Sequence, residues 1–351
     1  MDMKLLCGIR NFKLDSIDDY RTMDGYTISS NYEMMSKLFH TDDFLKKAGI
    51  LSAELEFEGT FFAVRVNPSI EIIFGSDKVA MTNKLTEQAL FLQNHLRHLM
   101  HFLWFIKDNS VSPSICMGYI YDRPELGKGT FVRFSEISII TNCYGEMEDV
   151  TFTKEDIDKA HTILNKYRKI CPGNPMEVDG NLNYADGEEI TPKLLVFKGK
   201  SSNDSYNDKN RVQRAFDFLS LARLSHLLIM KIALFIPVLE CLFSGEQGEL
   251  TQKVSERVAF YLGKTRDQRY LYFETIKDGY NLRSRYIHGD KLEKKHLKIE
   301  FQMDLSKKLD EICRLVLYRI IMDDFIDFLQ DEDSFRLYLK KLIFLPDCET
   351  L

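Results

Sequence analysis

The spacing of apolar residues divides this chain into a mixed first half and a helical second half. Residues 53–66 alternate between apolar and polar side chains around Gly59, a pattern that predicts a β-hairpin. Residues 116–121 and 130–141 predict a second pair of strands, joined by a turn rich in proline and glycine. Between the two pairs, residues 86–107 carry leucines at helical spacing. The first 150 residues are therefore expected to be α+β.

A further helix is predicted from its N-terminal cap. The run Thr-Lys-Glu-Asp at residues 153–156 is a variant of the capping box, and the helix should continue to Ile170. Residues 172–208 hold several prolines and glycines and close with a polar run. Such a long connection is uncommon inside a compact domain, so this segment is predicted to be a linker, with one short strand at residues 194–197.

The pattern becomes helical throughout from residue 211. We expect helices over residues 211–243, with a possible kink at Pro237, and over residues 251–262, 265–289, 304–329 and 334–345. Gly263 is expected to end the second of these in the left-handed conformation. The predicted fold is an α+β N-terminal domain (1–171), a linker (172–208) and an all-α helical bundle (209–351).

Composition places the chain among globular proteins. Of its 351 residues, 44% are hydrophobic and 28% are charged, which suits two domains and excludes a disordered chain. The seven cysteines are odd in number and no two have the spacing of a zinc knuckle or a redox pair, which predicts free thiols in a reducing cytoplasm. The N-terminus lacks the apolar run of a signal peptide. The most apolar stretch, residues 224–243, is interrupted by His226, Lys231 and Glu240, so it predicts a buried helix and no membrane association.

Charge is distributed unevenly along the chain. The formal net charge is -6, yet residues 209–300 hold 17 Lys and Arg against 11 Asp and Glu. Residues 301–351 have the opposite balance, with 7 against 11. A local basic field can attract phosphates in an acidic protein, although most such runs are solvated faces.

One segment carries candidate chemistry. Residues 280–289 read Tyr-Asn-Leu-Arg-Ser-Arg-Tyr-Ile-His-Gly, with Arg283 and His288 separated by four residues. This run resembles the Arg-x4–6-His motif of HEPN ribonucleases, in the form found in their Apea-like branch. Residues 235–243, with a Leu-Glu-x-Leu-Phe core, and residues 250–259 resemble two further segments of that branch in the same order. The resemblance covers roughly residues 209–325, and the first 200 residues match no family that we can name.

The resemblance implies metal-independent cleavage of RNA. Histidine, here His288, is the side chain type whose unperturbed pKa suits acid–base work near neutrality, and Arg283 offers a planar cation for a phosphate. On an ideal helix, positions five apart differ by about 140° and 7.5 Å, so the two side chains do not share a face. Either the helix frays near His288, or two subunits combine their residues, as the family implies. The structural alternative is an exposed arginine and a histidine at a helix end.

Four accessory residues accompany the pair. Glu240 lies in an apolar helical stretch, where a carboxylate needs a partner; an arginine of the motif is the natural one, and a structural ion pair or simple exposure are the alternatives. Ser284 occupies a motif position. Arg285 is a candidate phosphate contact or a solvated side chain. Tyr280 is a candidate for base stacking or, more simply, for core packing, and Tyr286 is a second candidate for stacking.

No cofactor and no metal are expected. His95, His98 and His101 are spaced along one predicted helix, but three such positions drift by about 120° around its axis and no acid lies among them.

The function expected from the resemblance is an endoribonuclease of antiviral, abortive-infection type. It would act as a homodimer on an RNA substrate, under control of the N-terminal domain and of a phage-derived trigger or regulatory protein. The alternative is a non-catalytic scaffold that dimerises or binds nucleotides, with the N-terminal domain as the recognition element.

Overall fold

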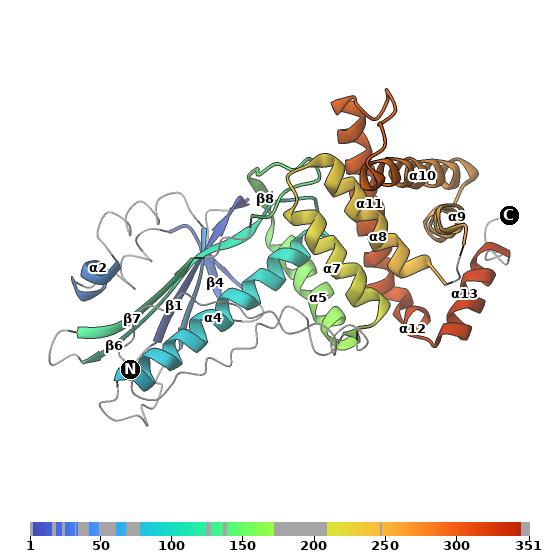
Figure 1. Ribbon diagram of the computed structural model, residues 1–351. Coiled ribbons are helices and arrows are strands. Elements are labelled where there is room, and N and C mark those ends of the chain that lie inside the picture. The colour runs from blue at the N-terminus through green and yellow to red at the C-terminus, as the bar shows by residue number, and fades with distance from the viewer. Residues whose placement is uncertain are drawn as a thin grey trace.

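The computed structural model, drawn in Figure 1, describes residues 3–15, 19–22, 25–31, 33, 42–48, 61–67, 78–123, 128–135, 139–171, 209–245 and 248–344. A sheet lies at the N-terminal end of the molecule, and helices make up the part that follows residue 209 (Figure 1). Both halves of the expected fold class, an α+β part followed by a helical part, are therefore present.

The N-terminal part is built on a six-stranded sheet with the order β3-β4-β5-β1-β6-β7. Every neighbouring pair in it is antiparallel. Its strands are β1 (Met3–Arg10), β3 (Tyr20–Arg21), β4 (Thr27–Ser29), β5 (Phe61–Asn67), β6 (Ser112–Arg123) and β7 (Lys128–Ser135).

The two faces of the sheet are both covered. Along β1, Leu5, Cys7 and Ile9 belong to the large core on the side of α4 (Lys78–Leu103), whereas Leu6 belongs to a smaller cluster with Phe44 of α2 (Asp42–Ala48). This alternation is the period of two that a strand imposes on its side chains. In Figure 1, α4 runs along the sheet and α2 lies at its outer corner.

The expected strands are present with different partners or lengths. The pairing of residues 116–121 with the strand that follows is confirmed, although β7 ends at Ser135 and not at residue 141. Residues 61–66 do form a strand, but β5 pairs with β1 and β4; the other arm of the predicted hairpin lies outside the described residues. The helix predicted over residues 86–107 is α4, which begins eight residues earlier, at Lys78, and ends at Leu103.

The next helix, α5 (Lys154–Ile170), begins as predicted. Thr153 is its N-cap, and both hydrogen bonds of the capping box with Asp156 are formed. Just before it, β8 (Val150–Phe152) pairs in parallel with β2 (Phe12–Leu14), a pairing that local patterns did not reveal. The predicted linker, residues 172–208, and its strand at 194–197 lie outside the described residues.

The helical part contains α7 (Arg211–Leu224), α8 (Leu228–Phe243), α9 (Leu250–Leu262), α10 (Arg266–His288), α11 (Ile299–Arg319), a π-helical segment η2 (Ile320–Asp324), α12 (Phe325–Phe328) and α13 (Glu332–Phe344). The helices predicted over 251–262, 265–289 and 334–345 are confirmed to within two residues. The helix predicted over 304–329 begins earlier, at Ile299, and changes to π geometry at Ile320.

Two of the expectations for this part are wrong. Residues 211–243 form two helices, broken at residues 225–227, and Pro237 lies within the second. The break is held by tertiary contacts: the Thr141 hydroxyl donates to the carbonyls of Arg223 and Ser225, and Lys231 Nζ donates to the carbonyl of Ala222 at 2.7 Å. Gly263 has φ of −81° and is extended, not left-handed.

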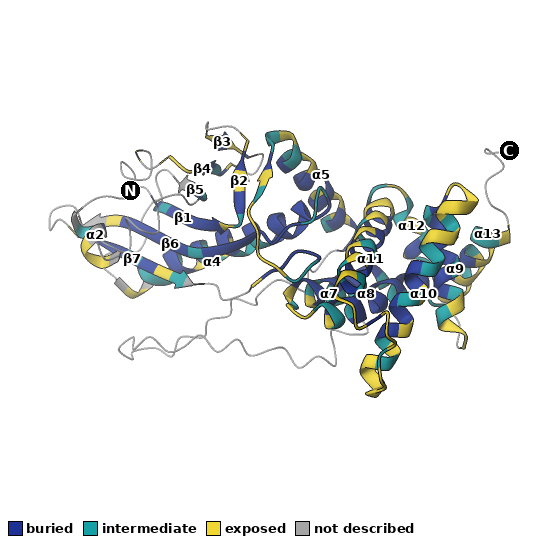
Figure 2. Cartoon of the chain, turned by 90° about the horizontal axis from the view of Figure 1, so that it is seen from above, coloured by how far each residue is buried: buried dark blue, intermediate teal, exposed yellow. Residues whose placement is uncertain are grey.

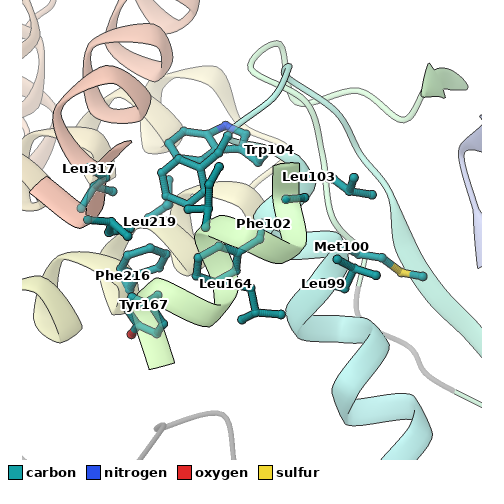
Figure 3. Close-up of a cluster of buried hydrophobic side chains, with 14 of the residues drawn as sticks. Leu99, Met100, Phe102, Leu103, Trp104, Leu164, Tyr167, Phe216, Leu219 and Leu317 are labelled. Atoms are coloured by element: carbon teal, nitrogen blue, oxygen red, sulfur yellow. The ribbon is translucent and has the colours of Figure 1, made fainter. Parts of the chain in front are cut away.

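One hydrophobic core joins the two parts of the molecule. Phe216 of α7 packs against Phe102 from the end of α4 and against Tyr167 of α5, with ring centroids 5.7 and 4.6 Å apart (Figure 3). Residues coloured as buried continue from the sheet through α5 into the helical part (Figure 2). The regions on either side of the predicted linker therefore pack on each other directly.

The described part of the chain has no helix that combines the length and the apolar character needed to cross a bilayer. Its six cysteines, Cys7, Cys116, Cys143, Cys171, Cys241 and Cys313, are free thiols, as the sequence predicted.

Candidate functional site

A close helix contact positions the motif arginine. Gly279 of α10 faces Ile236 of α8 and Leu309 of α11, and a Cβ atom at Gly279 would lie 2.7 Å from Ile236 Cδ1 and 3.0 Å from Leu309 Cδ1. The glycine thus allows α10 to approach its neighbours closely. One turn further along both helices, Arg283 reaches Glu240.

Arg283 and Glu240 form an ion pair, with Nη1 and Oε1 separated by 2.7 Å. The side chains keep 26% and 21% of their exposure, so both are half-buried and water still reaches them. The interpretation of Glu240 as the partner of a motif arginine is confirmed. Because such a partly solvated pair contributes little to stability, Arg283 remains available to a competing anion.

Tyr280 lies against the same carboxylate. Its ring is buried, as core packing requires, so base stacking by this residue is not supported by its position. Burial, followed by the nearby charge of Glu240, raises the pKa of the Tyr280 hydroxyl above its ordinary value. The hydroxyl therefore stays protonated, and Glu240 is flanked by a phenol and a guanidinium.

His288 is the last residue of α10 and is exposed. Gly289 follows as the C-cap with φ of +74° in the left-handed conformation, and the helix ends where the sequence predicted. The helix is continuous up to His288, so it does not fray there. In a regular helix the side chains of Arg283 and His288 point about 140° apart. A single chain therefore does not place this pair on one face.

Arg285 is engaged within the chain. Its guanidinium donates to the carbonyl of Lys291 and pairs with Glu293, both at 3.0 Å. Arg285 thereby fastens the segment that follows α10. Because it already has two partners, it is less free to contact phosphate than a fully solvated arginine. Ser284 and Tyr286, the two neighbours of Arg285 in the chain, are both exposed.

The three histidines of α4 do not gather around a common point that could hold a metal. All three are buried, and burial lowers the pKa of His98 to about 4, which keeps its imidazole neutral. Across the described ranges, no group of three or more His, Cys, Asp or Glu side chains has metal-binding geometry.

A second charged cluster lies where the N-terminal and helical parts meet, and the sequence did not reveal it. Asp310 of α11 accepts a hydrogen bond from Trp104 Nε1 at 2.8 Å and pairs with Arg314 at 2.7 Å. Nearby, Arg223 of α7 donates to the side chain and the carbonyl of Asn109. We refer to Trp104, Asn109, Arg223, Asp310 and Arg314 as the interface cluster.

Burial dominates the chemistry of the interface cluster. It raises the pKa of Asp310 to about 6 and lowers the pKa of Arg223 to about 10 and that of the adjacent Lys231 to about 8. The signal in the sequence was a set of charges at apolar helical positions. Such positions do not identify Trp104 as the partner of Asp310 or Asn109 as the partner of Arg223, because these residues are more than one hundred positions away.

Comparisons of this chain with family models, with curated proteins and with solved structures found no match. The functional argument therefore rests on the residues of the site and on the motif in which they lie.

Proposed function

We propose that this protein is a metal-independent endoribonuclease of HEPN type. The observation that carries the proposal is the arrangement at the end of α10: a solvent-accessible Arg283 held by Glu240, followed by an exposed His288 at a capped helix end. The spacing of these residues, and the two segments before them, are those of the motif described above.

The chemistry needs three groups. A base takes the proton of the 2′-hydroxyl, whose oxygen attacks phosphorus; the bond from phosphorus to the 5′-oxygen breaks, and an acid protonates that oxygen. A cation stabilises the charge that develops on the phosphorane. His288 suits the proton transfers and Arg283 suits the cation.

The proposal includes a dimer. The unbroken α10 directs Arg283 and His288 of one chain in different directions, which supports a site completed by the same residues of a second copy. The N-terminal part would regulate this site, and its extensive packing on the helical part gives a physical route for doing so. A role in antiviral, abortive-infection defence, with a phage-derived trigger, belongs to the same proposal.

Incubation of the purified full-length chain with total RNA in the presence of EDTA tests this function. We expect discrete fragments that carry 2′,3′-cyclic phosphate, or its hydrolysis product, and a 5′-hydroxyl. Cleavage that EDTA abolishes and magnesium restores would contradict the proposed chemistry.

The second candidate is a non-catalytic scaffold, favoured by the same ion pair, because Arg283 already has an internal partner. Intact RNA after incubation of a folded, dimeric protein with RNA and with candidate activators would favour the scaffold.

A further inference from the structure

The segment between α10 and α11, residues 289–298, projects from the helical part together with the first turn of α11 (Figures 1 and 2). We refer to these residues as the α10–α11 loop. The loop is largely exposed, yet it is fastened at several points. Arg285 binds the carbonyl of Lys291 and the carboxylate of Glu293, and Lys295 pairs with Asp278 of α10.

A buried histidine provides a further anchor for the loop. His296 is fully buried, and its ring lies 5.3 Å from that of Phe301. Its carbonyl accepts a hydrogen bond of 2.7 Å from Gln302 Nε2. Burial lowers the pKa of His296, so the imidazole is held neutral against α11. The backbone of a loop anchored in this way has little conformational freedom left to lose on binding.

The charged side chains of the loop outside these two ion pairs are three lysines and Asp290, which is exposed. Glu293 of the loop and Asp278 of α10 are both used in ion pairs with Arg285 and Lys295. Lys291, Lys294 and Lys298 are exposed, and within the described part of the chain none of them has an ion-pair partner. The ion pairs thus neutralise two acids of this region, and three exposed lysines remain against one exposed acid of the loop, Asp290.

These lysines lie three to ten positions after His288 in the chain. The C-terminal end of α10 carries a partial negative charge of about half a unit, which by itself repels phosphate. The three lysines of the adjoining loop outweigh this partial charge together with the carboxylate of Asp290, so the local field is positive. A polyanion is the partner that fits.

We propose that the α10–α11 loop binds the phosphate backbone of RNA through Lys291, Lys294 and Lys298, next to the proposed site at His288. This inference rests on the proposed function for the identity of the polyanion. The lysines are binding residues and take no part in bond breaking. The binding of RNA by these lysines can therefore be measured with an RNA that is not cleaved.

Binding of a fluorescent, 2′-O-methylated single strand to the full-length protein tests this assignment, because the oligonucleotide lacks the nucleophile for cleavage. The variant Lys291→Gln/Lys294→Gln/Lys298→Gln is compared with Lys264→Gln/Lys340→Gln/Lys341→Gln, which removes three exposed lysines elsewhere on the helical part. For three lost phosphate contacts, the slope of log Kd against log salt should decrease by about 2. The control variant should keep the wild-type slope and a Kd within about twofold of the wild-type value.

Equal slopes for the two variants would overturn the assignment, whether or not the wild-type protein cleaves RNA. A reduced slope in the loop variant alone would support it even if no nuclease activity were found. Competition by polyglutamate as strong as that by the single strand would overturn RNA as the partner.

Discussion

Two arginine-centred clusters in this protein differ in how far water reaches them. Arg223 in the interface cluster is 2% exposed, whereas the Arg283 side chain beside Glu240 keeps 26% of its exposure. Both contain acidic and aromatic partners. In the first, the contacts of Asp310 with Trp104 and of Arg223 with Asn109 join distant parts of the chain. In the second, the guanidinium has one ion pair and stays partly exposed. The buried charges of the interface cluster serve to hold the fold together, whereas the partly exposed Arg283 can also contact a ligand.

Physical chemistry assigns different consequences to the two. Removal of one partner from a buried charged cluster leaves the others desolvated and unmatched, so stability should fall steeply. Removal of one partner from a half-exposed pair costs little, because water replaces it. Variants should therefore affect stability in the interface cluster and activity at Arg283 and His288.

The largest effect is expected at the proposed site. Arg283→Ala and His288→Ala should each lower the rate of RNA cleavage by two to four orders of magnitude, since each removes a group on which the same transition state depends. The double variant should be little worse than either single variant, because residues that act as a unit are not additive. The rate at which each variant cleaves a defined RNA tests this expectation. Thermal melts of the same variants show whether the fold is retained.

Matched controls for these variants are Arg266→Ala and His226→Ala, which remove an exposed arginine from the start of α10 and an exposed histidine from the α7–α8 turn. Both should cleave at the wild-type rate. If Arg283→Ala and His288→Ala are also fully active with unchanged melts, the motif is not the site and the scaffold function is favoured.

The next effect is on stability. Asp310→Ala should reduce the free energy of unfolding by about 3–5 kcal/mol, because Trp104 Nε1 and Arg314 lose their acceptor inside the core. The comparison variant, Glu240→Gln, should cost no more than about 1 kcal/mol. Chemical denaturation of both variants gives the two values. Similar losses in the two variants would mean that exposure does not distinguish the clusters.

The smallest effect is the dependence of stability on pH. The pKa of Asp310 is raised from 3.8 to about 6, so the folded protein keeps a proton that the unfolded chain releases. Stability should therefore fall as pH rises from about 4 to about 6, by up to about 3 kcal/mol from this residue. The charged groups around Asp310 are Arg314 on its own helix, Arg223, Asp108 and, more remotely, Lys231.

The matched variant for this dependence is Asp310→Asn, which cannot titrate. Its unfolding free energy, measured against pH, should lack the part of the decline that Asp310 contributes between pH 4 and 6. A difference between wild type and variant that stays constant over this range would contradict the raised pKa.

Much of the local structure of this protein was determined by the sequence alone. Thr153 with Asp156 fixed the start of α5, and Gly289 fixed the end of α10, because a cap is formed by residues adjacent in the chain. The helical character of the second half followed from the apolar period, and the partner of Glu240 from the cost of leaving a carboxylate unpaired in apolar surroundings.

Other features were decided only by the tertiary structure. Residues 211–243 have a continuous helical pattern, yet the chain breaks at residues 225–227, where Thr141 binds the carbonyls that end α7. Likewise, β5 takes β1 and β4 as partners, and Asp310 meets Trp104 across 206 positions of the chain. Periodicity and capping report interactions over one or two turns. Contacts between distant segments depend instead on how whole elements pack, and no local pattern encodes that choice.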